Sequence, residues 1–215
     1  MMKFQTLYQS LKNKYPFLFF YFIIFFPCIP VLGGQLENCD LIFQISEDSD
    51  FSKAITETTA IDDSIKLSHV GIIWIDNDTP KVIEASPEEG VRIMNLEEFT
   101  LSCHNGFIIK RLSIEIPKDR IIERALSYVG QPYDWWYYPD NDKMYCSELI
   151  YESFLSSEGN NIFQGQPMNF RDSNGAIPDF WIQLFSELNQ KVPEGVIGTN
   201  PNDLFKDPRL IEVLF

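Results

Sequence analysis

The sequence predicts an α+β domain in which a mostly antiparallel sheet is flanked by helices. Segments rich in Val, Ile and Phe are joined by tight turns, and helical patterns with clear start and stop residues lie around them. The chain has 215 residues, of which 45% are hydrophobic and 22% charged, which suits one globular domain with a sizeable core. No internal repeat or low-complexity segment interrupts this pattern.

The first 34 residues differ in composition from the rest and predict export. Three lysines supply their only charges, an unbroken apolar run extends from Phe17 to Phe26, and small residues follow at Gly33 and Gly34. A basic start, a short apolar centre and a small-residue end are typical of a secretory signal peptide, with cleavage expected after Gly33 or Gly34. If the apolar run extends to Leu32, the segment would instead serve as an uncleaved membrane anchor.

The expected location is therefore secreted or periplasmic, with residues 35–215 as one exported domain. A lipid anchor is not expected, because Cys28 follows Pro27 rather than a small residue. Contact with a membrane is expected only through the N-terminal segment, if that segment is retained. The formal net charge of −14 repels phosphate backbones and acidic lipid surfaces, so nucleic acid is not expected as a partner. The sequence leaves the oligomeric state open.

The elements of the domain follow from hydrophobic patterns and boundary residues. Asn77 and Asp78 are turn residues between two Val- and Ile-rich segments, so a β-hairpin is expected there. Asn95 is expected to cap a short helix with Glu98 at its third position. Pro117 opens a helix that continues to about residue 129. The expected strands are 40–45, 68–75, 81–85, 91–94 and 106–112, and the other expected helices are 146–157 and 179–188, with one helical turn near 51–58.

Cys146 is the first candidate for chemistry, because it begins an expected helix. The N-terminal end of a helix carries unpaired N–H groups and partial positive charge, which stabilise a thiolate and can hold an oxyanion. A small, buried, unreactive cysteine is the alternative. Removal of the N-terminal segment would leave three cysteines, so a free thiol is expected. Cys39 and Cys103 would form a disulfide only if their geometry allows it.

His69 is the expected base, because the chain has only two histidines. It lies on an expected strand, where alternation places its side chain on the same face as Gly71 and Ile73. A satisfied structural histidine is the alternative interpretation of this position. The other histidine, His104, lies in an expected loop before Asn105 and is the alternative base.

Strand register indicates Glu84 as the partner of His69. With a two-residue turn in the hairpin, Glu84 faces Gly71 and is the diagonal neighbour of His69 on the same face, with Cα atoms about 7–8 Å apart. Two long side chains can close that gap, and Gly71 leaves room for them. A catalytic histidine needs such a carboxylate to fix its orientation. A solvated strand carboxylate is the alternative interpretation of Glu84.

Five short motifs follow one another along the chain. They are Asp40-Leu41-Ile42-Phe43, Ser68-His69-Val70-Gly71-Ile72, Ile83-Glu84-Ala85, Gly130-Gln131-Pro132-Tyr133-Asp134 and Tyr145-Cys146-Ser147-Glu148-Leu149-Ile150. Their order and spacing, from about residue 36 to 200, resemble the permuted papain-fold cysteine hydrolases, which are YiiX-like relatives of the NlpC-type cell-wall peptidases. His69 precedes Cys146, as the circular permutation implies. The first strand departs from the family pattern, because Cys39 stands where a glycine usually precedes the aspartate.

The resemblance implies a circularly permuted papain-like fold of the NlpC type. It also implies a catalytic triad of Cys146, His69 and Glu84. Tyr145 and Tyr133 would then line the active-site cleft, where they would bind substrate or donate a hydrogen bond to an oxyanion. Simple packing is the alternative role for both tyrosines.

The function that the resemblance implies is that of an exported cysteine peptidase or amidase. It would cleave an amide bond through a thioester, with cell-wall (murein) peptides as the substrate class. Two alternatives stay open, namely a lipid acyl hydrolase or acyltransferase with the same triad and a catalytically dead binding module. The expected partner is a peptide or acyl substrate. Neither a metal nor a cofactor is expected, because zinc-ligand spacings, a Walker loop and a dinucleotide glycine motif are absent from the sequence.

Overall fold

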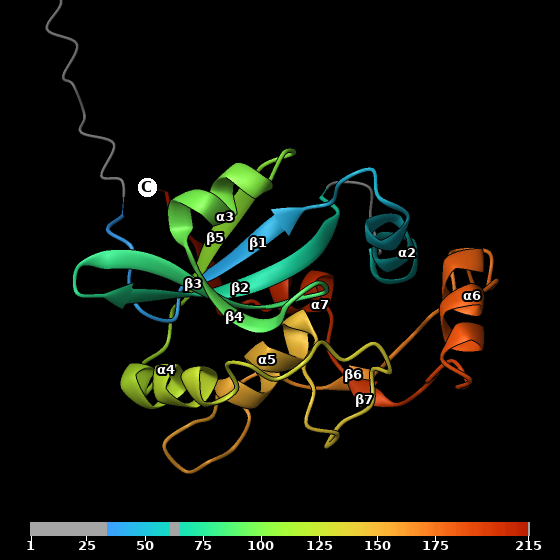
Figure 1. Ribbon diagram of the computed structural model, residues 1–215. Coiled ribbons are helices and arrows are strands. Elements are labelled where there is room, and N and C mark those ends of the chain that lie inside the picture. The colour runs from blue at the N-terminus through green and yellow to red at the C-terminus, as the bar shows by residue number, and fades with distance from the viewer. Residues whose placement is uncertain (1–33, 61–64, 215) are drawn as a thin grey trace, which may run out of the picture. The chain divides into compact units, whose positions relative to one another are not determined.

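The computed structural model describes residues 34–60 and 65–214, and it confirms the α+β class with one sheet of six strands (Figure 1). These strands are β1 (Leu41–Ile45), β2 (Leu67–Asp76), β3 (Thr79–Ser86), β4 (Gly90–Asn95), β5 (Phe107–Leu112) and β8 (Leu210–Glu212). They lie in the order β4-β3-β2-β1-β5-β8, and every neighbouring pair is antiparallel. A separate short ladder joins β6 (Gln166–Pro167) to β7 (Ile197–Gly198).

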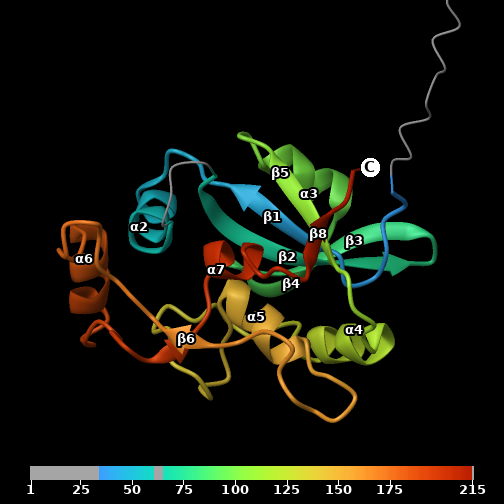
Figure 2. The same ribbon diagram turned by 180° about the vertical axis from the view of Figure 1, so that it is seen from behind.

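Helices cover both faces of the large sheet. In Figures 1 and 2, α3 lies on one face, whereas α4 and α5 lie on the other, and α2 and α6 lie side by side beyond one end of the strands. The helices are α2 (Asp50–Thr59), α3 (Leu96–Ser102), α4 (Lys118–Ser127), α5 (Cys146–Ser153), α6 (Asp179–Glu187) and α7 (Pro201–Phe205).

Alternating residues of β2 and β3 divide the core into two clusters. Ile73 and Val82 pack with Phe99 of α3 on one face, whereas Ile72 and Ile83 belong to the larger cluster that contains α4 and α5. Successive side chains of a strand point to opposite faces, and burying each of these large apolar side chains contributes roughly 1.5–3 kcal/mol. A register slip of one residue would exchange the two faces, so the core fixes the register.

The predicted hairpin and its register are confirmed. Asn77 and Asp78 have φ values of 47° and 64°, which matches a two-residue turn whose residues are both left-handed. Ile72 pairs with Ile83 across β2 and β3, as the turn requires. A Cβ atom at Gly71 would lie 2.5 Å from a methyl group of Val82, so the strands pack closely at this position.

Several boundaries differ from the sequence prediction. The helix that begins at Cys146 ends at Ser153, because the backbone of Phe154 leaves the helical region with ψ 74°. The single turn expected near 51–58 is a full helix, α2, in which the hydroxyl of Ser49 accepts a hydrogen bond from the N–H group of Ser52. Asn95 is the N-cap residue of α3, as predicted, but its side chain makes no capping hydrogen bond.

The sequence analysis missed β8, α7 and the β6–β7 ladder. These elements are two to five residues long, and β8 has only one fully buried side chain, that of Leu210. Segments this short do not show the periodicity that reveals a strand or helix. Pairing with β5 defines β8, and β6 and β7 are defined by pairing with each other.

All three cysteines of the described residues are free. Cys39 and Cys103 do not form a disulfide, because they belong to core clusters on opposite faces of the sheet. The thiol of Cys39 donates to the carbonyl oxygen of Lys118 at 3.5 Å, and that of Cys103 donates to the carbonyl oxygen of Phe99 at 3.2 Å. Cys39 has a φ of 70°, a conformation that glycine adopts without strain. This explains why a glycine suits the same position in the family pattern.

The predicted N-terminal signal segment lies outside the described residues, apart from Gly34. Among the residues that are described, no helix combines the length and the apolar character needed to cross a membrane.

Candidate active site

Cys146 is the first residue of α5, and its side chain is buried, with 4% of the residue exposed. The preceding residue, Tyr145, has an extended backbone (φ −98°, ψ 168°), so the helix begins abruptly at the cysteine. The N–H group of Tyr145 donates to Oε2 of Glu148 at 3.3 Å and joins the cap to the first turn. The first-turn N–H groups of a helix have no acceptor within the helix, so they are available to an anion beside Cys146.

The predicted contact between His69 and Glu84 is present. Nε2 of His69 lies 2.6 Å from Oε2 of Glu84, and the two side chains come from the adjacent strands β2 and β3. The imidazole also interacts with the thiol of Cys146, and its ring stacks on Phe99 of α3 at 6.1 Å between centroids. The fold therefore brings together the three side chains that the sequence analysis singled out.

The electrostatics of the site favour a charged imidazole. Burial alone would lower the pKa of His69, but hydrogen bonding to Cys146 and Glu84, together with their charges, raises it to about 10. Burial would likewise raise the pKa of Glu84, yet His69 and Arg92 hold it below its ordinary value. At neutral pH the imidazole of His69 is therefore charged and lies between the carboxylate of Glu84 and the sulfur of Cys146.

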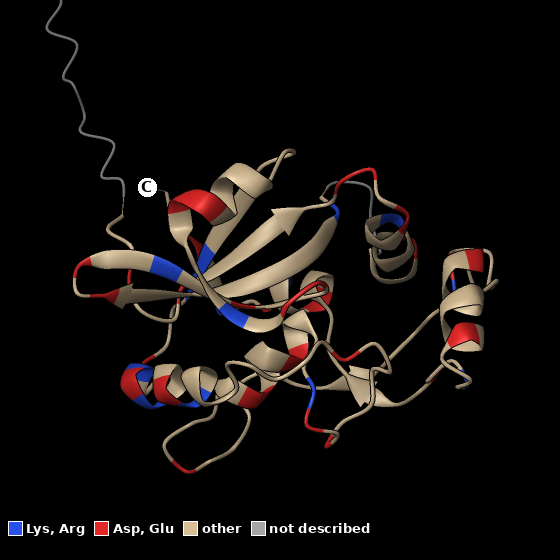
Figure 3. Ribbon diagram, viewed as in Figure 1, with Lys and Arg blue, Asp and Glu red and all other residues tan. Residues whose placement is uncertain are grey.

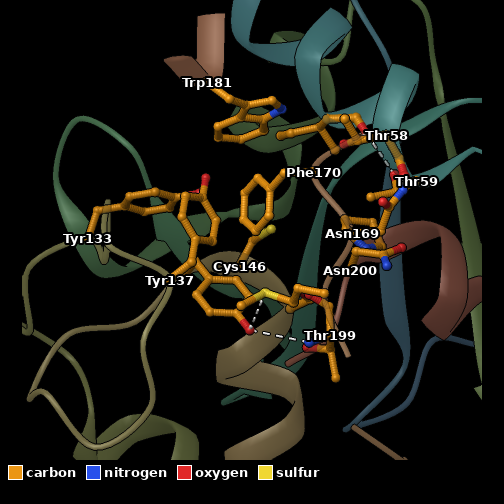
Figure 4. A pocket seen from close by; sticks show the side chains of 15 residues that line it. Thr58, Thr59, Tyr133, Tyr137, Cys146, Asn169, Phe170, Trp181, Thr199 and Asn200 are labelled. Carbon is orange, nitrogen blue, oxygen red and sulfur yellow. Dashed lines mark hydrogen bonds between the residues drawn. The ribbon is translucent and has the colours of Figure 1, made fainter. Parts of the chain in front are cut away.

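A cavity with a volume of about 50 Å³ lies beside Cys146. Figure 4 shows that its walls differ: the rings of Tyr133, Tyr137, Phe170 and Trp181 lie on one side, and Thr58, Thr59, Asn169 and Asn200 lie on the other. The remaining lining residues are Ile55, Tyr145, Ser147, Met168, Thr199 and Pro201. The cavity can therefore hold an apolar group against the rings and a polar group against the opposite wall.

Tyr145 and Tyr133 both line this cavity, as the resemblance implied. The hydroxyl oxygen of Tyr145 accepts a hydrogen bond from the N–H group of Thr199 at 3.2 Å, so the ring connects α5 to the end of β7. Tyr133 packs against the ring of Trp135 with centroids 4.9 Å apart. Burial raises the pKa of both tyrosines, so each hydroxyl keeps its proton and can donate it. Their part in binding or catalysis stays a prediction.

The alternative base, His104, lies elsewhere. Its side chain is largely exposed, and its Nδ1 atom is 3.2 Å from Oε1 of Glu47. Among the histidines of the described chain, only His69 interacts with the thiol of Cys146.

The sequence analysis missed two parts of the site. It singled out Tyr145 and Tyr133, but the cavity is also lined by Tyr137 and by Phe170 and Trp181, which come from the distant segment around α6. It also missed Arg92, which donates to Glu84. A signal for Arg92 was available, because a short turn after β3 places it opposite Glu84 on β4.

Comparisons with known proteins agree with this geometry. The family described as permuted papain-like amidase enzymes (YaeF/YiiX, C92 family) matches residues 35–214. The chain is 27% identical over 190 residues to an uncharacterized protein, YiiX, of Escherichia coli strain K12. The alignment covers 86% of this chain and 89% of that protein. It is also similar to a crystal structure described as the metalloprotein yiiX from Escherichia coli O157:H7. That match has a TM-score of 0.69 and 25% identity, and it covers 84% of this chain and 97% of the other.

Proposed function

Since the chain belongs to the permuted papain-like amidase family, a family of cysteine peptidases and amidases, we propose that it is an exported hydrolase of amide bonds with Cys146 as its nucleophile. His69 is the base and Glu84 orients it. The observation that carries this assignment is the 2.6 Å contact between Nε2 of His69 and Oε2 of Glu84, on an imidazole whose pKa Cys146 also raises.

The mechanism follows from this arrangement. The proton of the Cys146 thiol rests on His69, and the sulfur attacks the carbonyl carbon of the substrate amide. The first-turn N–H groups of α5 stabilise the resulting oxyanion. His69 then gives its proton to the departing amine as the C–N bond breaks. A water molecule, deprotonated by His69, attacks the thioester, releases the acid and returns the sulfur to its starting state.

We propose cell-wall peptides as the substrate class. Two considerations support this choice, namely the resemblance to NlpC-type cell-wall peptidases and the N-terminal segment, which would deliver the enzyme to the compartment that holds the wall. The wall of the cavity that contains Thr58, Asn169 and Asn200 is polar, which suits a peptide better than a hydrocarbon chain. Export itself is tested by cell fractionation, with the mass of the recovered protein showing whether the segment has been removed.

A second candidate keeps the triad and changes the acyl group. The apolar side of the cavity, with Tyr137, Phe170 and Trp181, would accept a hydrocarbon chain, which favours a lipid acyl substrate.

The similar structure from Escherichia coli O157:H7 is described as a metalloprotein, so the fit of a metal to this chain matters. Within the described residues, no group of three or more His, Cys, Asp and Glu side chains is placed to hold a metal ion. The described part of the chain therefore does not fit a metal site of that kind, and the proposed mechanism uses none.

Two measurements test the proposal. Incubation of the protein with murein peptides and, separately, with phospholipids is read by mass spectrometry. Release of amino acids or peptide fragments supports the amidase, and release of free fatty acid supports the second candidate. Neither product should form with the Cys146→Ala variant.

Alkylation of Cys146 by iodoacetamide near neutral pH separates an enzyme from a dead binding module. We expect fast labelling in the wild type and slow labelling after His69→Ala, with His104→Ala as the matched control that keeps the wild-type rate. Labelling of the wild type as slow as that of an ordinary thiol would contradict the assignment of Cys146 as a nucleophile.

A further inference from the structure

The sheet carries a further charged group that contacts the triad. Charged residues are sparse along β1 to β5 (Figure 3), yet Arg92 of β4 lies directly opposite Glu84 of β3. Its Nε and Nη2 atoms are each 2.8 Å from Oε1 of Glu84. The other carboxylate oxygen, Oε2, contacts His69. Each oxygen of the carboxylate is thus occupied by a different cation.

The guanidinium of Arg92 is fixed at its other end as well. Its Nη1 atom donates to Oε1 of Glu89 at 2.6 Å, and Glu89 lies in the turn between β3 and β4. Its Nη2 atom is 3.8 Å from the sulfur of Met94. These contacts hold the planar group in one orientation, so Arg92 offers Glu84 a preformed pair of donors.

The surroundings of Glu84 make these donors important. The Glu84 side chain is only 5% exposed, and burial favours the protonated form of a carboxyl group. The titratable and charged groups that face it are His69 on β2, Arg92 on β4 and Cys103 at the end of α3, while Cys146 acts through His69. Arg92 is therefore the permanent cation in this group, because it keeps its charge when the imidazole loses a proton.

We propose that Arg92 is a positioning residue of the active site, which fixes the orientation of Glu84 and keeps it ionised so that the Cys146–His69 pair stays reactive in mildly acidic solution. This inference rests on the proposed function. The guanidinium of Arg92 contacts Glu84, Glu89 and Met94, so it acts through Glu84.

A specific pH signature follows from this role. Without Arg92, Oε1 of Glu84 would be buried without a cationic donor, and the carboxyl group would take up a proton at a higher pH. A neutral Glu84 supports the imidazolium less well, so the rate at which Cys146 reacts would fall on the acidic side. At higher pH Glu84 would be ionised in either protein, and the two rates would converge. A merely structural residue would instead lower the rate equally at all pH values.

The test compares Arg92→Met with Arg92→Lys and with Glu89→Gln. Glu89→Gln is the control, because it removes the exposed partner of Arg92 but leaves the contact of Arg92 with Glu84. The first readout is the rate of Cys146 alkylation by iodoacetamide from about pH 4 to pH 9, with unreacted Cys39 and Cys103 showing that the fold is intact. The second readout is the titration of the Glu84 carboxyl carbon by NMR in protein labelled with ¹³C-glutamate. The Glu84 signal is identified by its absence from Glu84→Gln.

In Arg92→Met we expect the Glu84 titration and the acidic limb of alkylation to move up by about one pH unit, a tenfold change on that limb. A smaller shift in the same direction is expected for Arg92→Lys, and no shift is expected for Glu89→Gln. If Arg92→Met does not fold, the comparison of Arg92→Lys with the wild type carries the test. An unchanged Glu84 titration, or an equal loss of rate at every pH, would overturn the inference. Slow alkylation of the wild type would count against the hydrolase instead, and the Glu84 titration would still decide the role of Arg92.

Discussion

Glu148 provides a quantitative test of how burial shapes this site. It lies in the first turn of α5, two residues after Cys146, and only 7% of it is exposed. Burial, reinforced by the nearby carboxylates of Asp134 and Glu152, raises its pKa from 4.5 to about 8, although the N–H group of Tyr145 partly opposes the shift. The folded protein therefore holds a proton on Glu148 at neutral pH that the unfolded chain releases.

The direction of the effect on stability follows from this shift. A carboxyl group whose pKa is raised by folding contributes its full stability below the unfolded value of 4.5, and this contribution is lost as the pH rises toward 8. At about 1.4 kcal/mol for each pKa unit, the loss across that window is on the order of 5 kcal/mol. Substitution by glutamine removes the titration and keeps an oxygen that can accept the hydrogen bond from Tyr145.

The assay is urea unfolding of the wild type and of Glu148→Gln at pH 5, 7 and 9. The free energy of unfolding of Glu148→Gln, relative to that of the wild type, should increase by several kcal/mol between pH 5 and pH 9. Glu123→Gln, at an exposed position on α4, is the matched control and should show no such trend. A difference between Glu148→Gln and the wild type that does not change with pH would refute the reasoning.

Three further predictions concern the neighbourhood of the nucleophile. Tyr145→Phe removes the hydroxyl that accepts a hydrogen bond from the N–H group of Thr199, so the free energy of unfolding should fall by about 1–2 kcal/mol in urea titrations. An unchanged free energy would contradict a role for this hydrogen bond in stability. Gly198→Ala would place a Cβ atom 2.7 Å from the same hydroxyl, so the rate of Cys146 alkylation should fall below that of the wild type; an equal rate would show that the cavity tolerates the methyl group. Since the pKa of His69 is raised to about 10 from 6.5, the imidazolium should persist across neutral pH, and hydrolysis should decline with a midpoint near pH 10 in a pH–rate profile. A decline centred near 6.5 would contradict that assignment.

The contact between His69 and Glu84 could be predicted because it depends on local geometry. Asn77 and Asp78 favour the left-handed backbone of a two-residue turn, and such a turn fixes which residues of the hairpin are neighbours. Once the register is set, the diagonal relation of the two side chains follows without further information. The same reasoning, carried one strand further, would have placed Arg92 opposite Glu84.

The cavity could not be predicted in the same way. Phe170 and Trp181 lie well beyond α5 in the sequence, and they reach the cavity only because α6 packs beside α2. The indole N–H group of Trp181 donates to the carbonyl oxygen of Ala54 at 3.2 Å. The side-chain amide of Asn169 donates to the carbonyl oxygen of Thr58 at 3.0 Å. Contacts between segments more than a hundred residues apart leave no periodic trace in the sequence.

The sequence by itself determined the class of fold, the hairpin register and the identity of the three side chains proposed for catalysis, because each follows from alternation, turn chemistry or the start of a helix. The tertiary structure alone decided that the thiol of Cys146 meets the imidazole of His69, that Cys39 and Cys103 stay apart, and that aromatic and polar walls enclose the space beside the sulfur. The physical reason is the range of the interactions: hydrogen bonding within a hairpin is local, whereas the approach of α5 to β2 depends on the packing of the whole core.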